Sequence, residues 1–170
     1  MTSSSGMSPA PEHATHMLPA HIRQAVTGPM WHGPALDELL ADVTVEIAHA
    51  HSIPGAHSIW ELVLHIAAWA EIVQTRLGMT PTPQPTDAEN FPPVPAPTAE
   101  SWTSAIHRLQ KSHEDLASAA AALDRSLLRA EVPGRGYTVG AMLHGVIEHS
   151  TYHGGQIAIL KRASSTSRGQ

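Results

Sequence analysis

The stretch TAESWTSAIHRLQKSHEDLASAAAALDRSLL, residues 98–128, carries the hydrophobic pattern that decides the fold. Its apolar positions recur at alternating intervals of four and three residues, which places them on one face of an α-helix. A repeat of this kind predicts the seam of a helix that packs inside a bundle. The seam positions are Trp102, Ile106, Leu109, His113, Leu116, Ala120 and Leu123.

Other segments of the chain have the same helical periodicity. A short one covers about residues 14–26, and longer ones cover about 34–50, 58–77 and 138–162. Glycine and proline at 28–29, 54–55 and 133–134 separate them. The segment at 58 opens with Ser58-Ile-Trp-Glu61, a capping box that predicts a helix start. No segment alternates with a period of two for long enough to predict a strand, so the predicted fold class is all-α.

A proline-rich connection separates the second and third long helices. Residues 79–97 hold seven of the fourteen prolines, which excludes a helix or a central strand there. Its length suggests a crossover between distant ends of a bundle, or a lid over a site. The 170 residues suit a single domain, which we place at 13–162, with polar tails at 1–12 and 163–170.

The composition excludes several classes of function. With no cysteine, the chain has no disulfide, no thiolate metal ligand and no cysteine nucleophile. The net charge is −5, and the ten lysines and arginines form no cluster, so we expect no nucleic-acid partner. No apolar run is long enough for a membrane span, and the N-terminus lacks the pattern of a signal peptide. We therefore expect a cytoplasmic protein with no membrane partner.

Thirteen histidines are present, and helix geometry sorts them. In the last predicted helix His153 lies within the apolar stripe, His149 lies at its edge, and His144 faces the opposite side. Because His149 and His153 are four residues apart, their rings are stacked one turn above the other. His65 lies at the edge of the apolar side of the 58–77 helix. Three histidines from two helices therefore converge on one bundle interior, which predicts a metal site.

A structural interpretation competes with the metal site. An inward-facing histidine is often a hydrogen-bonded core residue, although two buried imidazoles one turn apart each need a partner. His113 occupies a seam position of its helix. From the sequence it is a fourth ligand, a residue that supports a ligand, or a core histidine, and we favour the last two.

Two blocks of this sequence resemble the DinB-like (DinB/YfiT) metal-binding four-helix-bundle superfamily. They are WELVLHIAAW, residues 60–69, and the late pattern His149-x-x-x-His153-x-Gly-Gln156. The resemblance extends over about residues 14–162. It implies a bundle with up-down-down-up connectivity, here preceded by a short extra N-terminal helix, and a long crossover at 79–97. It also implies a divalent metal held by His65, His149 and His153, and a homodimer.

The resemblance implies either metal-dependent hydrolysis or transfer chemistry that uses a low-molecular-weight thiol, on a small-molecule substrate. Three imidazoles leave a coordination position open, and nitrogen ligands favour Zn²⁺ or Ni²⁺. Gln156 lies near the histidines and is expected to orient a ligand or substrate. Glu61, one turn before His65, is expected to hold its second ring nitrogen or to act as a base, although the capping box already explains it. The alternative is a non-catalytic metal-binding, structural or stress-related interaction protein.

Overall fold

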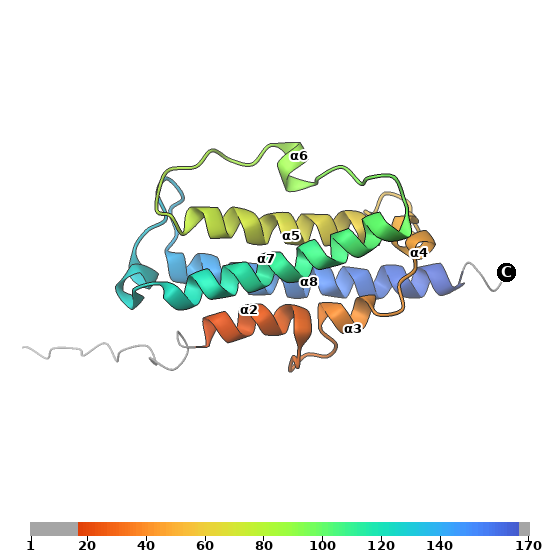
Figure 1. The fold of residues 1–170 in the computed structure, drawn as a ribbon, viewed down its shortest axis with the longest axis horizontal. Coiled ribbons are helices and arrows are strands. Elements are labelled where there is room, and N and C mark those ends of the chain that lie inside the picture. The colour runs from red at the N-terminus through yellow and green to blue at the C-terminus, as the bar shows by residue number, and fades with distance from the viewer. Residues whose placement is uncertain (1–16, 167–170) are drawn as a thin grey trace, which may run out of the picture.

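A computed structural model describes residues 17–166; helices dominate this part of the chain, and it contains no β-strand. The predicted all-α bundle is confirmed (Figure 1). One side consists of α2 (Leu18–Thr27) and α3 (Leu36–Leu40), which lie end to end and run in the same direction. Helices α5 (Ile59–Arg76) and α7 (Ala99–Ala122) run back, and α8 (Val139–Thr166) runs forward again. This order is the expected up-down-down-up connectivity.

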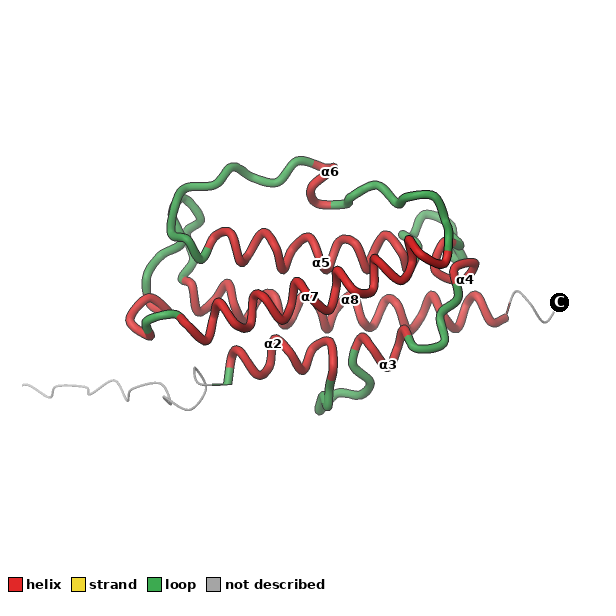
Figure 2. Tube along the Cα trace, in the orientation of Figure 1, coloured by secondary structure: helices red, strands yellow, loops and turns green. Residues whose placement is uncertain are grey.

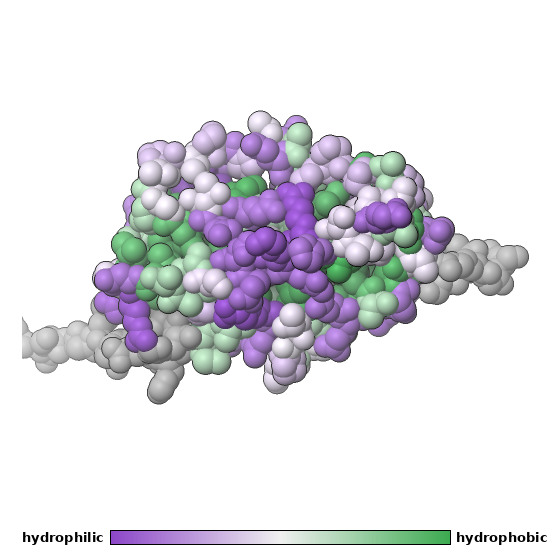
Figure 3. Space-filling model, in the orientation of Figure 1, coloured by the Kyte–Doolittle hydropathy of each residue, from purple (hydrophilic) through white to green (hydrophobic). Residues whose placement is uncertain are grey.

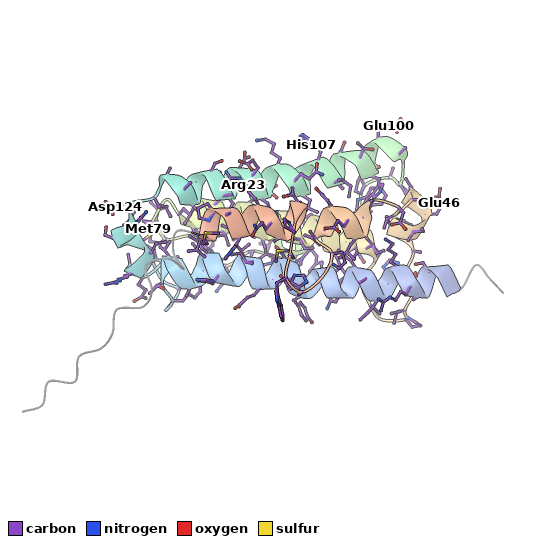
Figure 4. The ribbon with its side chains drawn as sticks, turned by 90° about the horizontal axis from the view of Figure 1, so that it is seen from below. Arg23, Glu46, Met79, Glu100, His107 and Asp124 are labelled. Atoms are coloured by element: carbon purple, nitrogen blue, oxygen red, sulfur yellow. The ribbon has the colours of Figure 1, made fainter. Side chains whose placement is uncertain are left out.

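The first side of the bundle differs from the prediction. The N-terminal helix, expected as a short extra helix that precedes the four, packs against α7 and α8 and forms the first side together with α3. Viewed from below, α2 and α3 lie between α7 and α8 (Figure 4). Arg23 of α2 joins Glu114 of α7 through two hydrogen bonds of 2.7 and 2.8 Å.

The segment 34–50 was predicted as one helix, and it forms two. Helix α3 ends before residue 41, and α4 (Val45–His49) begins after Thr44, whose hydroxyl accepts from the Ile47 amide. Between them Val43 is buried, and its carbonyl oxygen accepts a 3.0 Å hydrogen bond from Trp102 Nε1. The break is stabilised because an interhelical bond and a new cap satisfy backbone groups that a continuous helix would pair internally.

The ends of the later helices follow their capping residues. Ser58 and Glu61 form the predicted capping box of α5. Helix α7 ends at Ala122, short of the predicted Leu128, because Asp124 caps a separate 3₁₀ helix, η1 (Arg125–Arg129). Helix α8 runs through Thr166, so residues 163–166 of the predicted C-terminal tail are helical. The predicted tail at 1–12 lies outside the described residues.

The proline-rich connection is a crossover. It leaves the end of α5, returns along the length of that helix and enters α7 at the opposite end (Figure 2). The prediction that no helix forms in this segment was wrong at one place. Midway the chain forms one short helix, α6 (Asp87–Asn90), because residues 86–91 contain no proline and Thr86 and Glu89 cap it reciprocally. The crossover therefore places residues 87–91 over the middle of α5.

Two apolar clusters fill the bundle, and polar side chains lie between them. The boundary between the two clusters falls at the same level on three helices. On α5 it lies between Ala67 and Ala70, and on α7 between Leu109 and Leu116. On α8 it lies between Val146 and Ile157. The outer face of α7, by contrast, is hydrophilic (Figure 3). Within residues 17–166, none of the helices combines the length and apolarity that crossing a membrane requires.

Candidate metal centre

The three predicted histidines lie together beside the boundary between the two apolar clusters. His65 comes from the middle of α5, and His149 and His153 come from successive turns of α8. One ring nitrogen of each lies within 4.8 Å of the others, and the Nε2 atoms of His65 and His149 are 2.9 Å apart. The ring centroids are separated by 4.5 to 4.8 Å. Nitrogen atoms at these separations are close enough to bind one ion.

Hydrogen bonds fix the tautomer of two of the rings. The Nδ1–H of His65 donates to the backbone carbonyl of Asn90 at 2.6 Å, and the Nδ1–H of His153 donates to Oε1 of Gln156 at 2.8 Å. A neutral imidazole carries one proton, so each ring keeps a lone pair on Nε2. Metal-ligating histidines are oriented in the same way by a bond to their other nitrogen.

His149 differs from the other two. Its Nδ1 is buried and has no hydrogen-bond partner, while its Nε2 faces Nε2 of His65. When Nδ1 carries the proton, two lone pairs meet at 2.9 Å, an arrangement that a cation between them would stabilise. The orphaned nitrogen and the facing lone pair therefore fit a metal ion.

Burial keeps the cluster neutral. It lowers the pKa of His149 to about 3, with further lowering by His153 and His65. Burial also lowers the pKa values of His65 and His153, although the hydrogen bonds that these rings donate to Asn90 and Gln156 act in the opposite direction. Neutral imidazole is the form that binds a metal, so no proton has to be removed first at neutral pH.

The crossover supplies further contacts to His65, from residues that were not predicted from the sequence. Phe91 lies between His65 and His57, with its ring centroid 4.0 Å from each. Asn90 accepts from His65 through its backbone oxygen, and from Trp69 Nε1 at 2.8 Å through its side chain. The signal that could have located these residues is the capping pattern Thr86-x-x-Glu89, which predicts a helical turn just before them.

The remaining candidates lie in different places. Gln156 contacts the candidate ligand His153, as described above. Glu61 does not contact His65: its Oε2 accepts from the Ser58 amide at 2.6 Å and lies 3.1 Å from His51 Nε2. Its carboxylate is also 3.5 Å from His57 Nδ1. The expectation that Glu61 holds the second ring nitrogen of His65 was therefore wrong, because the Asn90 carbonyl occupies that place.

His113 is a core histidine outside the cluster. It is buried, its Nδ1–H donates to the carbonyl of Leu109 at 3.0 Å, and its Nε2 lies 3.0 Å from the hydroxyl of Ser150. Because the carbonyl accepts from Nδ1–H, Nε2 is an acceptor for Ser150. His113 thus joins α7 to α8 next to the candidate ligand His149 and lies outside the three-histidine cluster.

A cavity of about 540 Å³ opens beside the histidines, between α5 and α8. Tyr152, an exposed residue, is on its rim. The walls are mainly apolar, and no aspartate or glutamate lies among the described residues that line it. The lining includes Trp69, Val73, Arg76, Tyr137, Met142, Gly145 and Val146. A cavity of this size and character suits a small molecule.

The donor set defines the metal chemistry. Three imidazole nitrogens and no carboxylate favour Zn²⁺ or a similar transition metal over Mg²⁺ or Ca²⁺, which prefer oxygen. Three protein ligands also leave a position open for water or substrate, unlike a structural zinc site with four.

Comparison with known proteins agrees with this geometry. The family profile of the DinB superfamily matches residues 31–157, which covers α3, α5, α7 and all three histidines. No curated protein and no solved structure matches the chain. Because the match spans more than half of the sequence, the chain belongs to the DinB superfamily.

Proposed function

We propose that this protein is a metal-dependent enzyme that acts on a small molecule, either as a hydrolase or as a transferase of a low-molecular-weight thiol. His65, His149 and His153 would hold one divalent ion, with Zn²⁺ or Ni²⁺ favoured. One observation carries the proposal: the three neutral imidazoles border a cavity large enough for a substrate.

The chain's own residues would bind and position the reactants. Trp69, Val73 and Val146 offer apolar walls that exclude water from the reacting groups. Asn90 and Gln156 hold the rings of His65 and His153 in the tautomer with a free Nε2. When bound, the metal would supply a Lewis acid that makes a water or a thiol a stronger nucleophile at neutral pH. Any such thiol is a separate molecule, because the chain has no cysteine.

One observation favours a second candidate, a non-catalytic metal-binding protein. A hydrolase commonly uses a carboxylate or histidine as general base, and the described cavity lining has no carboxylate. Glu61 stays a proposed catalytic residue, although its contacts place it at the start of α5 and beside His57. In this alternative the ion stabilises the bundle without turnover.

The test is metal-dependent turnover. Esters, amides and thiol-reactive electrophiles are assayed with and without an added thiol, using zinc-loaded, nickel-loaded and chelator-stripped protein. We expect turnover of at least one class that stripping abolishes and metal restores. His153→Ala should lose it, whereas His144→Ala, which removes an exposed histidine of the same helix, should keep it. Turnover that persists in stripped protein and in His153→Ala would overturn the proposal.

A further inference from the structure

Arg76 is a buried cation that lines the same cavity and has no acidic partner among the described residues. Its exposed fraction is 3%, and its Nε and Nη2 atoms are buried without a hydrogen-bond partner. Only Nη1 is engaged, donating to the hydroxyl of Tyr137 at 3.0 Å. An unpaired buried charge is costly, so a cation left in this state at a cavity wall indicates a ligand.

The unpartnered atoms form one edge of the guanidinium. Elsewhere in this chain the same edge binds a carboxylate: Arg23 uses Nε and Nη2 for both oxygens of Glu114. Arg108 does the same with Glu71, at 2.8 and 2.7 Å. Two parallel N–H groups match the two oxygens of a carboxylate, which makes this pairing both strong and specific.

Arg76 has a second cation nearby, and no carboxylate lies among the described residues that line the cavity. Burial lowers the pKa of Arg76 most, and Arg135 lowers it further, while Tyr137 acts in the opposite direction. Nη2 of Arg135 is held by the carbonyls of Thr82 and Pro83, so it is fixed in place. A single guanidinium edge suits a group with one charge and two oxygens, which favours a carboxylate over a phosphate.

The position of Arg76 relates it to the histidines. It follows His65 by eleven residues on α5, about three turns on the same face. Its Cζ lies 5.5 Å from the centre of the Trp69 ring, which is itself 5.8 Å from the His149 ring. The guanidinium is therefore no farther from His149 than the sum of these two distances, a span that a small molecule covers.

We infer that the Nε/Nη2 edge of Arg76 anchors the carboxylate of a small substrate whose apolar body lies along Trp69 and whose reacting group reaches the three histidines. This inference rests on the proposed function for the role of the histidines. The anchoring of the carboxylate itself is independent of any metal. The substrate class is thus a monocarboxylate with an apolar segment between its acid group and its reacting group.

The test measures the binding of 4-phenylbutyrate and of its neutral amide to stripped and zinc-loaded protein by calorimetry. In stripped wild type the carboxylate should bind at least about tenfold more tightly than the amide, as charge-assisted bonds predict. Arg76→Gln should lose this preference. Arg108→Gln, which removes an arginine on the outer face, should retain it. A thermal melt of each variant confirms folding.

If Arg76→Gln fails to fold, Arg76→Lys replaces it, since lysine keeps the charge but lacks the paired N–H groups. The preference of Arg76→Lys for the carboxylate over the amide should be about tenfold smaller than that of wild type. An equal preference in wild type and in the Arg76 variants would overturn the inference. So would a preference that disappears when zinc is stripped from wild type, because the carboxylate would then be bound to the metal. An Arg76-dependent preference in protein that never binds zinc would support the anchor while the proposed function fails.

Discussion

The carbonyl oxygen of Asn90 lies 2.6 Å from Nδ1 of His65, so the crossover between α5 and α7 orients a residue of the candidate metal centre. The side chain of Asn90 holds the crossover in place, because its oxygen accepts from Trp69 Nε1 at 2.8 Å. The connection that the sequence shows only as proline-rich is thus part of the site.

Replacing Asn90 by alanine should weaken metal binding. The substitution removes the acceptor for Trp69, so the turn that presents the carbonyl to His65 loses its anchor. Loss of such supporting contacts typically lowers metal affinity by about 10- to 100-fold. Competition with a chromophoric zinc chelator measures the change. Asn90→Asp keeps an acceptor oxygen, so its zinc affinity should be closer to that of wild type. Equal zinc affinity in wild type and both variants would exclude a role for the Asn90 side chain in supporting the site.

The capping box of α5 should contribute stability and not metal affinity. Ser58 Oγ accepts from the Glu61 amide at 3.2 Å, and the Glu61 carboxylate accepts from the Ser58 amide. Ser58→Ala and Glu61→Ala should each lower the free energy of unfolding by about 1 kcal/mol, as measured by urea denaturation. Zinc content should be unchanged. A Glu61→Gln variant that keeps its stability and metal yet loses turnover would instead assign Glu61 a catalytic role.

His113 should make the metal-free protein sensitive to acid. Burial lowers its pKa from an ordinary value near 6.5 to about 4, so between these values the unfolded chain binds more protons than the folded one. The contribution of His113 to the free energy of unfolding is therefore fully present above pH 6.5. It is lost as the pH drops toward 4, which lowers the free energy of unfolding by about 3 kcal/mol.

Chemical denaturation at pH 7 and pH 4.5, in the presence of a chelator, measures this loss. His113→Gln should start less stable at pH 7 because the contacts with Leu109 and Ser150 are weakened. Between pH 7 and pH 4.5 its free energy of unfolding should then fall by less than that of wild type. A remaining loss is expected from His149, whose pKa is also lowered. The same pH-dependent loss in variant and wild type would contradict the assignment to His113.

Filling the cavity at Gly145 should block small-molecule binding without removing the metal. A Cβ added there meets no atom within 4 Å, and the residue lines the cavity. Gly145→Leu should therefore fold and retain zinc. It should bind 4-phenylbutyrate more weakly by at least about tenfold. Gly155→Leu is the matched control, since Gly155 is equally uncrowded on α8 but lies outside this cavity. Equal binding by the two variants would mean that ligands enter elsewhere.

Local patterns in the sequence were sufficient to predict the helices and the three converging histidines. Periodicity located α5, α7 and α8, and a spacing of four placed His149 above His153. The break after Leu40 was not predicted. Its Thr44 cap is local, but the other contact that stabilises it joins Val43 to Trp102, 59 positions apart. The same holds for Asn90, whose carbonyl meets His65 only because the crossover folds back over α5. It holds also for Arg76, which lines the cavity only because α8 packs against α5.

Catalytic roles were the least predictable part of the site. Spacing placed Glu61 one turn before His65, and the fold shows the predicted capping box but no bond from Glu61 to that ring. A catalytic role for Glu61 stays a prediction. The absence of a carboxylate from the described cavity lining is likewise a property of the packed helices, since several acidic residues lie on the same elements facing outward. Helix periodicity predicts on which face of its helix a residue lies, but not which residue of a neighbouring element it contacts.

The most direct test of the metal centre is elemental analysis of untagged wild type beside His153→Ala and His144→Ala. We predict about one zinc or nickel ion per chain in wild type and in His144→Ala, and almost none in His153→Ala, with unchanged helix content by circular dichroism. Wild-type protein that carries no metal and does not bind added zinc or nickel would contradict the account. So would a metal content in His153→Ala equal to that of wild type.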